Sequence, residues 1–188
     1  LYHIDHYTLS GVPNTGFTEA LAFVFQKRDL MLMGYDQAVD DNTTLDIFSG
    51  LYEIMGVSLV DMRMWQWLYA HPDATAQQLR EATLAIAKEV WNTYYYPVLG
   101  EQDSPILACY SHMVNAPMYL PNYPFGHIVE FQLEEHLSQF PTKQAFADEI
   151  MRIYKLGKLT PNQWMQQAVG AKVSTTPILN AVEAILKK

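Results

Sequence analysis

Glu19 and six histidines are the residues of this sequence whose types and surroundings suggest metal chemistry. Glu19 lies in an apolar stretch, where a carboxylate is costly to bury unless it is paired or bound to a metal. Zinc sites use histidine, cysteine and carboxylate ligands, and the single cysteine, Cys109, leaves no cysteine-based site. The HExxH motif, which places two histidines on one face of a helix, is absent, as are a P-loop, GxGxxG and GxSxG. The remaining candidate residues lie in two separate segments of the sequence, described here as two pieces.

The first piece is a Gly/Pro/Asn loop that runs into an apolar helix with Glu19 in its first turns. The second piece is His112, followed by Tyr119 and Tyr123 in a proline-rich loop and then by a further helix. Taken alone, each residue has an ordinary explanation. Glu19 can be solvated or salt-bridged, His112 can be a structural histidine, and both tyrosines can simply pack at a loop.

Together the two pieces resemble the gluzincin zinc peptidases of the neurolysin and angiotensin-converting-enzyme group. In that group a Gly-Phe-x-Glu-Ala stretch supplies the third zinc ligand about two dozen residues after HExxH, and Glu19 stands at that position. The group then carries a histidine and, about ten residues later, a tyrosine before a helix with a Phe-Gln-x-x-Glu-x-Leu-like stretch. Residues 131–137 fit that helix, and by its register Tyr123 matches the tyrosine and His112 the histidine.

The resemblance implies that the full-length protein hydrolyses peptide bonds in oligopeptides with the help of zinc. Glu19 would be the third zinc ligand, beside a position left open for water. Tyr123 and His112 would donate hydrogen bonds to the oxyanion that forms at the tetrahedral stage. Tyr119 would contact the peptide substrate.

The same resemblance makes residues 1–188 a C-terminal, helical fragment of a larger neurolysin-like catalytic domain. The HExxH helix, with two zinc histidines and the general base, would precede Leu1 in a missing N-terminal half. This fragment alone would then be inactive, with zinc absent or incompletely coordinated. Where the converting enzymes carry an aspartate that orients a zinc histidine, this chain has Phe23, so that partner would come from elsewhere or be absent.

Helices must position these residues, because apolar residues recur at helical spacing and no alternating run suggests a strand. The pattern predicts one all-α domain over residues 1–188, with helices at 17–33 (ended by Gly34), 43–70, 75–96, 106–113, 125–140, 142–156, 161–169 and 177–186. The broad apolar face of the second helix is expected to include Met55 and Met62. Three prolines within residues 115–124 predict an extended connection that carries both tyrosines.

Composition favours a folded protein, because 49% hydrophobic and 13% aromatic residues supply enough apolar surface for a core. The formal net charge of −8 comes from interleaved acidic and basic residues. Since no basic run could follow a phosphate backbone, nucleic acid is not an expected partner. No apolar stretch reaches the length needed to span a bilayer, so no membrane partner is expected either.

Two other classes of protein are compatible with these features. A helical domain that keeps the metallopeptidase scaffold without the metal would serve as a binding or interaction module. A free-standing helical structural protein would fold without a large exposed apolar surface. Bound zinc and an upstream HExxH would distinguish the peptidase from the binding module, whereas an exposed or partner-buried face around Glu19 and Tyr123 would distinguish it from the structural protein.

Overall fold

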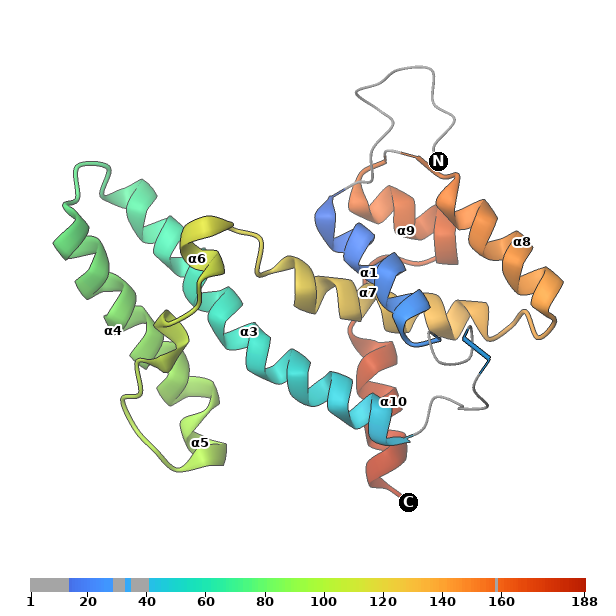
Figure 1. Ribbon diagram of the computed structural model, residues 1–188, viewed down its shortest axis with the longest axis horizontal. Helices are drawn as coiled ribbons and strands as arrows, with labels where there is room; N and C mark the ends of the chain where they lie inside the picture. Colours follow the sequence, from blue (N-terminus) through green and yellow to red (C-terminus); the bar gives the residue numbers. More distant parts are fainter. Residues whose placement is uncertain (1–13, 29–32, 35–40, 158) are drawn as a thin grey trace. The chain divides into compact units, whose positions relative to one another are not determined.

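The computed structural model describes residues 14–28, 33–34, 41–157 and 159–188, which form helices joined by turns and loops (Figure 1). The helices are α1 (Thr15–Gln26), α3 (Asp41–Ala70), α4 (Ala76–Tyr94), α5 (Tyr96–Leu99), the 3-10 helix η2 (Ile106–Ala108), α6 (His112–Asn115), α7 (Asn122–Leu137), α8 (Lys143–Tyr154), α9 (Pro161–Val169) and α10 (Thr176–Leu186). No strand occurs in these ranges, which confirms the all-α class. Within the same ranges, no helix combines the length and the apolar character needed to cross a membrane.

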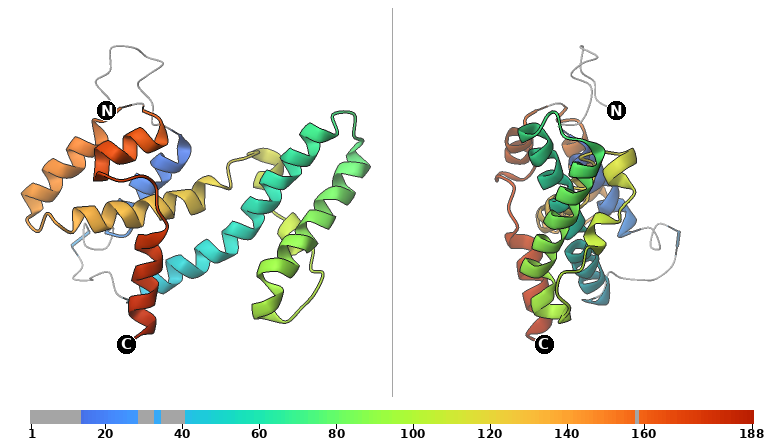
Figure 2. Two further views of the ribbon diagram at one scale, coloured as in Figure 1. Left: turned by 180° about the vertical axis from the view of Figure 1, so that it is seen from behind. Right: turned by 90° about the vertical axis from the view of Figure 1, so that its left-hand side faces the viewer.

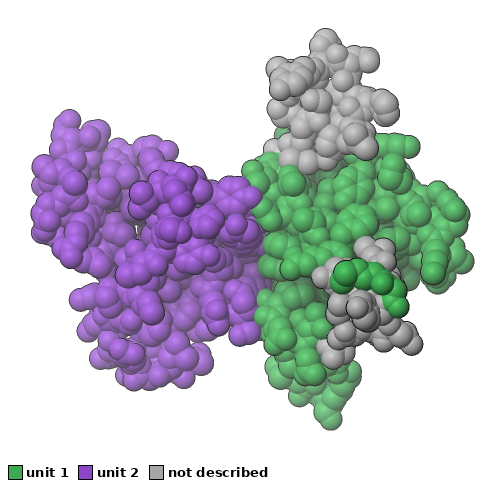
Figure 3. Space-filling model, viewed as in Figure 1, with its two compact units in different colours: residues 1–48, 125–188 green, residues 49–124 purple. Residues whose placement is uncertain are grey.

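The chain divides into two compact units (Figure 3). Unit 1 comprises residues 1–48 and 125–188, and unit 2 comprises residues 49–124. The boundaries fall within α3 and within α7, so unit 2 is one continuous segment and unit 1 is built from the two segments that flank it. Each unit has a hydrophobic core of its own. The expectation of a single domain stays a prediction.

The core of unit 1 is built from one face each of α1, α7, α8 and α9. On α1 the buried residues recur three or four positions apart, as expected for an amphipathic helix. Phe17 is fully buried, and its ring contacts Trp164 of α9 edge-on, with the ring centroids 4.8 Å apart. The same ring lies 5.4 Å from that of Phe125 in α7. These contacts hold α1, which carries Glu19, against α7 and α9.

Ion pairs also connect the helices of unit 1. Arg28, just after α1, forms a bidentate pair with Glu134 of α7. Glu149 of α8 pairs with Arg152 and lies 2.6 Å from Nε2 of His136 in α7. The hydrogen bonds from Arg152, assisted by His136, lower the pKa of Glu149 from 4.5 to about 2, although burial acts in the opposite direction. Glu149 is therefore an ionised link between α7 and α8 at neutral pH.

In unit 2, α4 runs antiparallel to the preceding part of α3 (Figure 2). The connection between them ends at Thr75, whose side chain forms a capping box with Gln78 and so satisfies N–H groups at the start of α4. The core of unit 2 lies between these helices and the segment that follows them. It contains Val57, Val60, Met64, Ala87, Val90, Trp91, Tyr95, Leu107, Met113 and Leu120.

The buried side of α3 differs from the apolar face expected from its large side chains. Met55 and Met62 are 41% and 36% exposed, so the expectation is wrong for these two residues. The buried positions 57, 60, 61 and 64 form a neighbouring stripe at helical spacing. Apolar residues occur around most of this helix, and their spacing therefore does not select the buried side.

Helix α1 is shorter than predicted, because it ends at Gln26 rather than at Met33. Lys27 is its C-cap, and the Lys27 N–H donates to the carbonyl of Phe23 at 3.0 Å. Phe25 is exposed and Met33 is exposed, so no buried contact of these side chains extends the helix. Gly34, the predicted C-cap, therefore does not end this helix.

Gly56 allows the ring of Tyr95 to pack directly on the backbone of α3. A Cβ atom added to Gly56 would lie 2.6 Å from two atoms of that ring. The ring is held in place, because it is buried and stacks on Trp91 with the centroids 5.3 Å apart. Its hydroxyl also donates a hydrogen bond to the carbonyl of Tyr52 at 2.6 Å. A side chain at position 56 therefore has no space.

We expect Gly56→Ala to lower the free energy of unfolding by about 1–3 kcal/mol, because an added methyl group in a filled contact forces neighbouring groups apart. Gly50→Ala is the matched control on the same helix, since nothing lies within 4 Å of its added Cβ. That control should raise the free energy of unfolding by about 0.5–1 kcal/mol, as alanine is the better helix former. Urea denaturation measures both values. Equal stability of the two variants would contradict the packing of Tyr95 on Gly56.

Candidate functional site

His112, Tyr119 and Tyr123 lie together in unit 2, and we call them the aromatic cluster. The centroid of the His112 ring lies 6.3 Å from that of each tyrosine ring. The two tyrosine rings meet edge to face with their centroids 5.4 Å apart. The three residues for which the sequence predicts oxyanion and substrate contacts are therefore neighbours.

Two backbone turns position the tyrosines. The N–H of Tyr119 donates to the carbonyl of Ala116 at 3.1 Å, and that of Tyr123 donates to the carbonyl of Leu120 at 3.2 Å. The Leu120 side chain is fully buried in the core of unit 2, which fixes the second turn. The side-chain amide of Asn122 donates to the carbonyl of Tyr119 at 2.9 Å and so links the two turns. Both tyrosines thus belong to one hydrogen-bonded segment.

The prediction of an extended connection over residues 115–124 is wrong, because Asn115 ends α6 and residues 116–121 form turns. Helix α7 begins at Asn122, so Tyr123 and Pro124 lie in its first turn. Proline is tolerated there because the N–H groups of a first turn have no partner within the helix. The exclusion of helix from a proline-rich segment therefore fails where a proline falls at a helix start.

His112 has an unusual hydrogen-bonding state. Its Nδ1 atom is buried and has no hydrogen-bond partner in the described part of the chain. The side chain as a whole is half-buried, and the ring of exposed Tyr110 lies 5.3 Å away. Buried polar atoms in native proteins are commonly satisfied by protein groups, ordered water or ions. Oδ1 of Asp61, Nε1 of Trp65 and Oε1 of Glu130 are in the same state within the described residues.

Glu19 lies in unit 1, on α1, at the point where this helix contacts α7. Gly126 of α7 permits the contact, because a Cβ added to it would lie 2.8 Å from the Cβ of Glu19 and 3.0 Å from the ring of Phe23. The same atom would lie 3.3 Å from the backbone nitrogen of Ala20. The Glu19 side chain is half-buried. The backbone of α7 therefore fixes the base of this side chain.

A histidine–carboxylate pair in α7, not predicted from the sequence, lies beside Phe23, which follows Glu19 by one turn of α1. Glu130 is 1% exposed, and its Oε2 atom lies 2.8 Å from Nδ1 of His127. Lys27 approaches the other carboxylate oxygen at 3.8 Å. The His127 ring stacks on Phe23, with the centroids 3.9 Å and the planes 3° apart. The signal of this pair in the sequence is a histidine and a glutamate three residues apart on a predicted helix.

The described ranges contain no group of three or more His, Cys, Asp or Glu side chains placed to hold a metal ion. Glu19 belongs to unit 1, and the aromatic cluster belongs to unit 2. Glu19 itself carries a carboxylate, a ligand type that zinc accepts.

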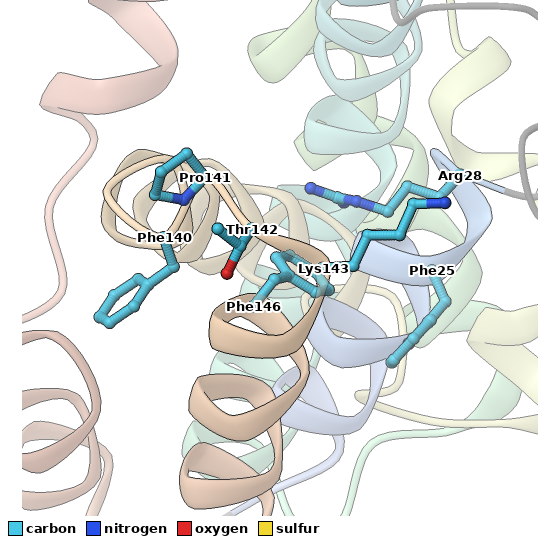
Figure 4. A pocket seen from close by; sticks show the side chains of 7 residues that line it. All are labelled: Phe25, Arg28, Phe140, Pro141, Thr142, Lys143 and Phe146. Atoms are coloured by element: carbon cyan, nitrogen blue, oxygen red, sulfur yellow. The ribbon is translucent and has the colours of Figure 1, made fainter.

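A pocket of about 560 Å³ in unit 1 is lined by Phe25, Phe140 and Phe146 together with Arg28 and Lys143 (Figure 4). The guanidinium carbon of Arg28 lies 4.9 Å from the centroid of the Phe146 ring. None of the residues predicted from the sequence to be functional is among the described lining residues. The pocket adds no group to the candidate site.

None of the protein families, curated proteins or solved structures compared with this chain matches it. The geometry of its side chains and the motifs of its sequence are therefore the basis for a functional proposal.

Proposed function

We propose that the full-length protein is a zinc-dependent peptidase that hydrolyses peptide bonds in oligopeptides. The observation that carries this proposal is the close approach of His112, Tyr119 and Tyr123. The proposed roles require these side chains to act on one substrate group, and so to be neighbours.

The aromatic cluster offers hydrogen-bond donors for a developing oxyanion. During hydrolysis the oxygen of the scissile carbonyl gains negative charge as the tetrahedral intermediate forms. The phenolic O–H of Tyr123 and a ring N–H of His112 would form stronger hydrogen bonds as that charge grows, so they would stabilise the transition state more than the bound substrate. Tyr119, whose ring contacts that of Tyr123, would hold the peptide beside them.

Glu19 would be the zinc ligand that this chain contributes. Zinc, when bound, lowers the pKa of a coordinated water and polarises the scissile carbonyl. The packing of α1 holds the backbone of Glu19 in place, because this helix contacts Gly126 of α7 and because Phe17 packs on Trp164 of α9. A ligand on a rigid helix needs little rearrangement to bind a metal ion. The two histidine ligands and the general base would belong to an HExxH helix outside this sequence.

The test uses the natural protein, including any residues that precede Leu1. Zinc per chain is measured by plasma mass spectrometry, and hydrolysis of a quenched fluorescent peptide is followed before and after treatment with a chelator. We expect about one zinc ion per chain, loss of hydrolysis on chelation and recovery when zinc is restored. Hydrolysis that survives complete metal removal would contradict the proposal. A folded protein with neither zinc nor hydrolysis would instead support the metal-free binding module.

A further inference from the structure

Asp61 is a buried carboxylate within the core of unit 2. It lies on α3 and is 0% exposed, next to Val60 and one turn before Met64 in the same buried stripe. Burial raises the pKa of Asp61, and the hydrogen bond from the backbone of Met118 offsets this effect only in part. An ionisable group is costly at such a position unless it is hydrogen-bonded. The group that donates a hydrogen bond to this carboxylate therefore explains how its burial is tolerated.

That partner is the segment before α7. Oδ2 of Asp61 accepts a hydrogen bond from the N–H of Met118 at 2.9 Å, across 57 residues of sequence. The Trp65 indole lies one turn further along α3 and lowers the pKa of Asp61. Within the described residues, however, neither Oδ1 of Asp61 nor the indole N–H makes a hydrogen bond of normal geometry. The contact with Met118 is thus the well-formed bond of this carboxylate.

Met118 has a backbone conformation that needs support. Its φ angle is +60°, in the left-handed region that residues with a side chain rarely adopt. Its side chain is 44% exposed, so packing of that side chain holds the backbone only in part. The hydrogen bond to Asp61 acts on the backbone itself. This hydrogen bond and the turn bond from the N–H of Tyr119 to the carbonyl of Ala116 together support the conformation.

We propose that Asp61 is a positioning residue that sets the turn carrying Tyr119, whose ring in turn contacts that of Tyr123. Met118 directly precedes Tyr119, and Leu120 is anchored in the core. If Met118 relaxed to a negative φ, Tyr119 would have to absorb the change of chain direction, because Leu120 is fixed. The effect of this turn on catalysis rests on the proposed function, whereas its effect on the conformation of the tyrosines does not.

Hydrogen–deuterium exchange in the natural protein and in Asp61→Ala tests the contact directly. Peptides covering residues 116–122 should exchange at least about tenfold faster in the variant, and the peptide around Val90 of α4 should change much less. Asp46→Ala, which removes an exposed aspartate of the same helix, is the matched control and should change neither peptide. Equal acceleration in both peptides would mean that Asp61 only stabilises unit 2, and would overturn the proposal.

Fluorine NMR of protein labelled with fluorotyrosine reports on the rings themselves. In Asp61→Ala the signals of Tyr119 and Tyr123, assigned by Tyr→Phe substitutions, should shift, and that of exposed Tyr69 should not. Adding Met118→Gly should return both signals toward their native positions, because glycine adopts a φ of +60° without support. Unchanged signals in Asp61→Ala would overturn the proposal, as would a failure of Met118→Gly to restore them.

Kinetic measurements separate this inference from the proposed function. In an active peptidase, Asp61→Ala should lower kcat at least about tenfold, and Met118→Gly should partly restore it. If Tyr123→Phe leaves hydrolysis unchanged, the proposed role of Tyr123 fails, and the exchange and fluorine results still decide the role of Asp61. If Tyr123→Phe lowers kcat but Asp61→Ala does not, the positioning role is overturned.

Discussion

Glu19→Gln in the natural protein should weaken zinc binding by at least about 100-fold, because a neutral amide replaces a ligand carboxylate. Removing a group that merely supports a metal ligand typically costs about 10–100-fold in affinity, and the ligand itself should cost at least as much. The substitution keeps the Cβ atom that contacts Gly126, so the packing of α1 on α7 should persist. Competition with a chelating dye measures the affinity, and far-ultraviolet circular dichroism verifies the fold.

Glu135→Gln is the matched control for this variant. Glu135 lies on α7 in the same unit and is exposed, and its replacement removes the same charge. This control should bind zinc with unchanged affinity. A Glu19→Gln protein that retained its full metal content would show that Glu19 is not a ligand, whatever its effect on hydrolysis.

Tyr123→Phe should lower kcat by about 10²–10³-fold with little change in KM, as is typical when a donor to an oxyanion is removed. The hydroxyl is proposed to act mainly on the charge that develops in the transition state, so substrate binding should be almost unaffected. Initial rates of hydrolysis of a fluorogenic peptide, measured over a range of peptide concentrations, give kcat and KM separately. An increase in KM alone would refute the role of Tyr123 as an oxyanion donor.

Two further tyrosines serve as comparisons for Tyr123. Tyr119→Phe should change KM more than kcat, because Tyr119 is proposed to contact the substrate. Tyr110→Phe should change neither constant, although the Tyr110 ring also lies close to His112, at 5.3 Å. If all three variants lost activity to the same degree, a general disturbance of the aromatic cluster would be the better explanation.

The parts of the fold that could be predicted are those with local signals. Thr75 marks the start of α4, because a capping box acts within one helical turn. Helix α9 occupies the predicted range Pro161–Val169, with proline at its start and Gly170 in the left-handed conformation after its end. The end of α1 and the buried side of α3 depend instead on which apolar side chains find partners in other helices, and this information is not local.

In the candidate site, too, some residues could be predicted from local sequence and others could not. The nearness of Tyr119, Tyr123 and His112 could be anticipated, because the three residues lie within twelve positions of the sequence. Asp61 could not be assigned a role, because its partner lies 57 residues away and is a backbone N–H group. Its signal in the sequence is an acidic residue that directly follows Val60 and precedes Met62. The zinc-ligand role of Glu19 stays a prediction.

The divided sequence of unit 1 has a consequence for synthesis on the ribosome. Its ion pair between Arg28 and Glu134 joins residues 106 positions apart, and closing a flexible loop of that length costs about 4 kcal/mol of chain entropy. Unit 2 emerges as one piece and makes shorter connections, such as that between Tyr95 and Tyr52, which are 43 positions apart. Its helices can therefore pack first. The apolar face of α1 therefore stays uncovered until α7, α8 and α9 have been synthesised.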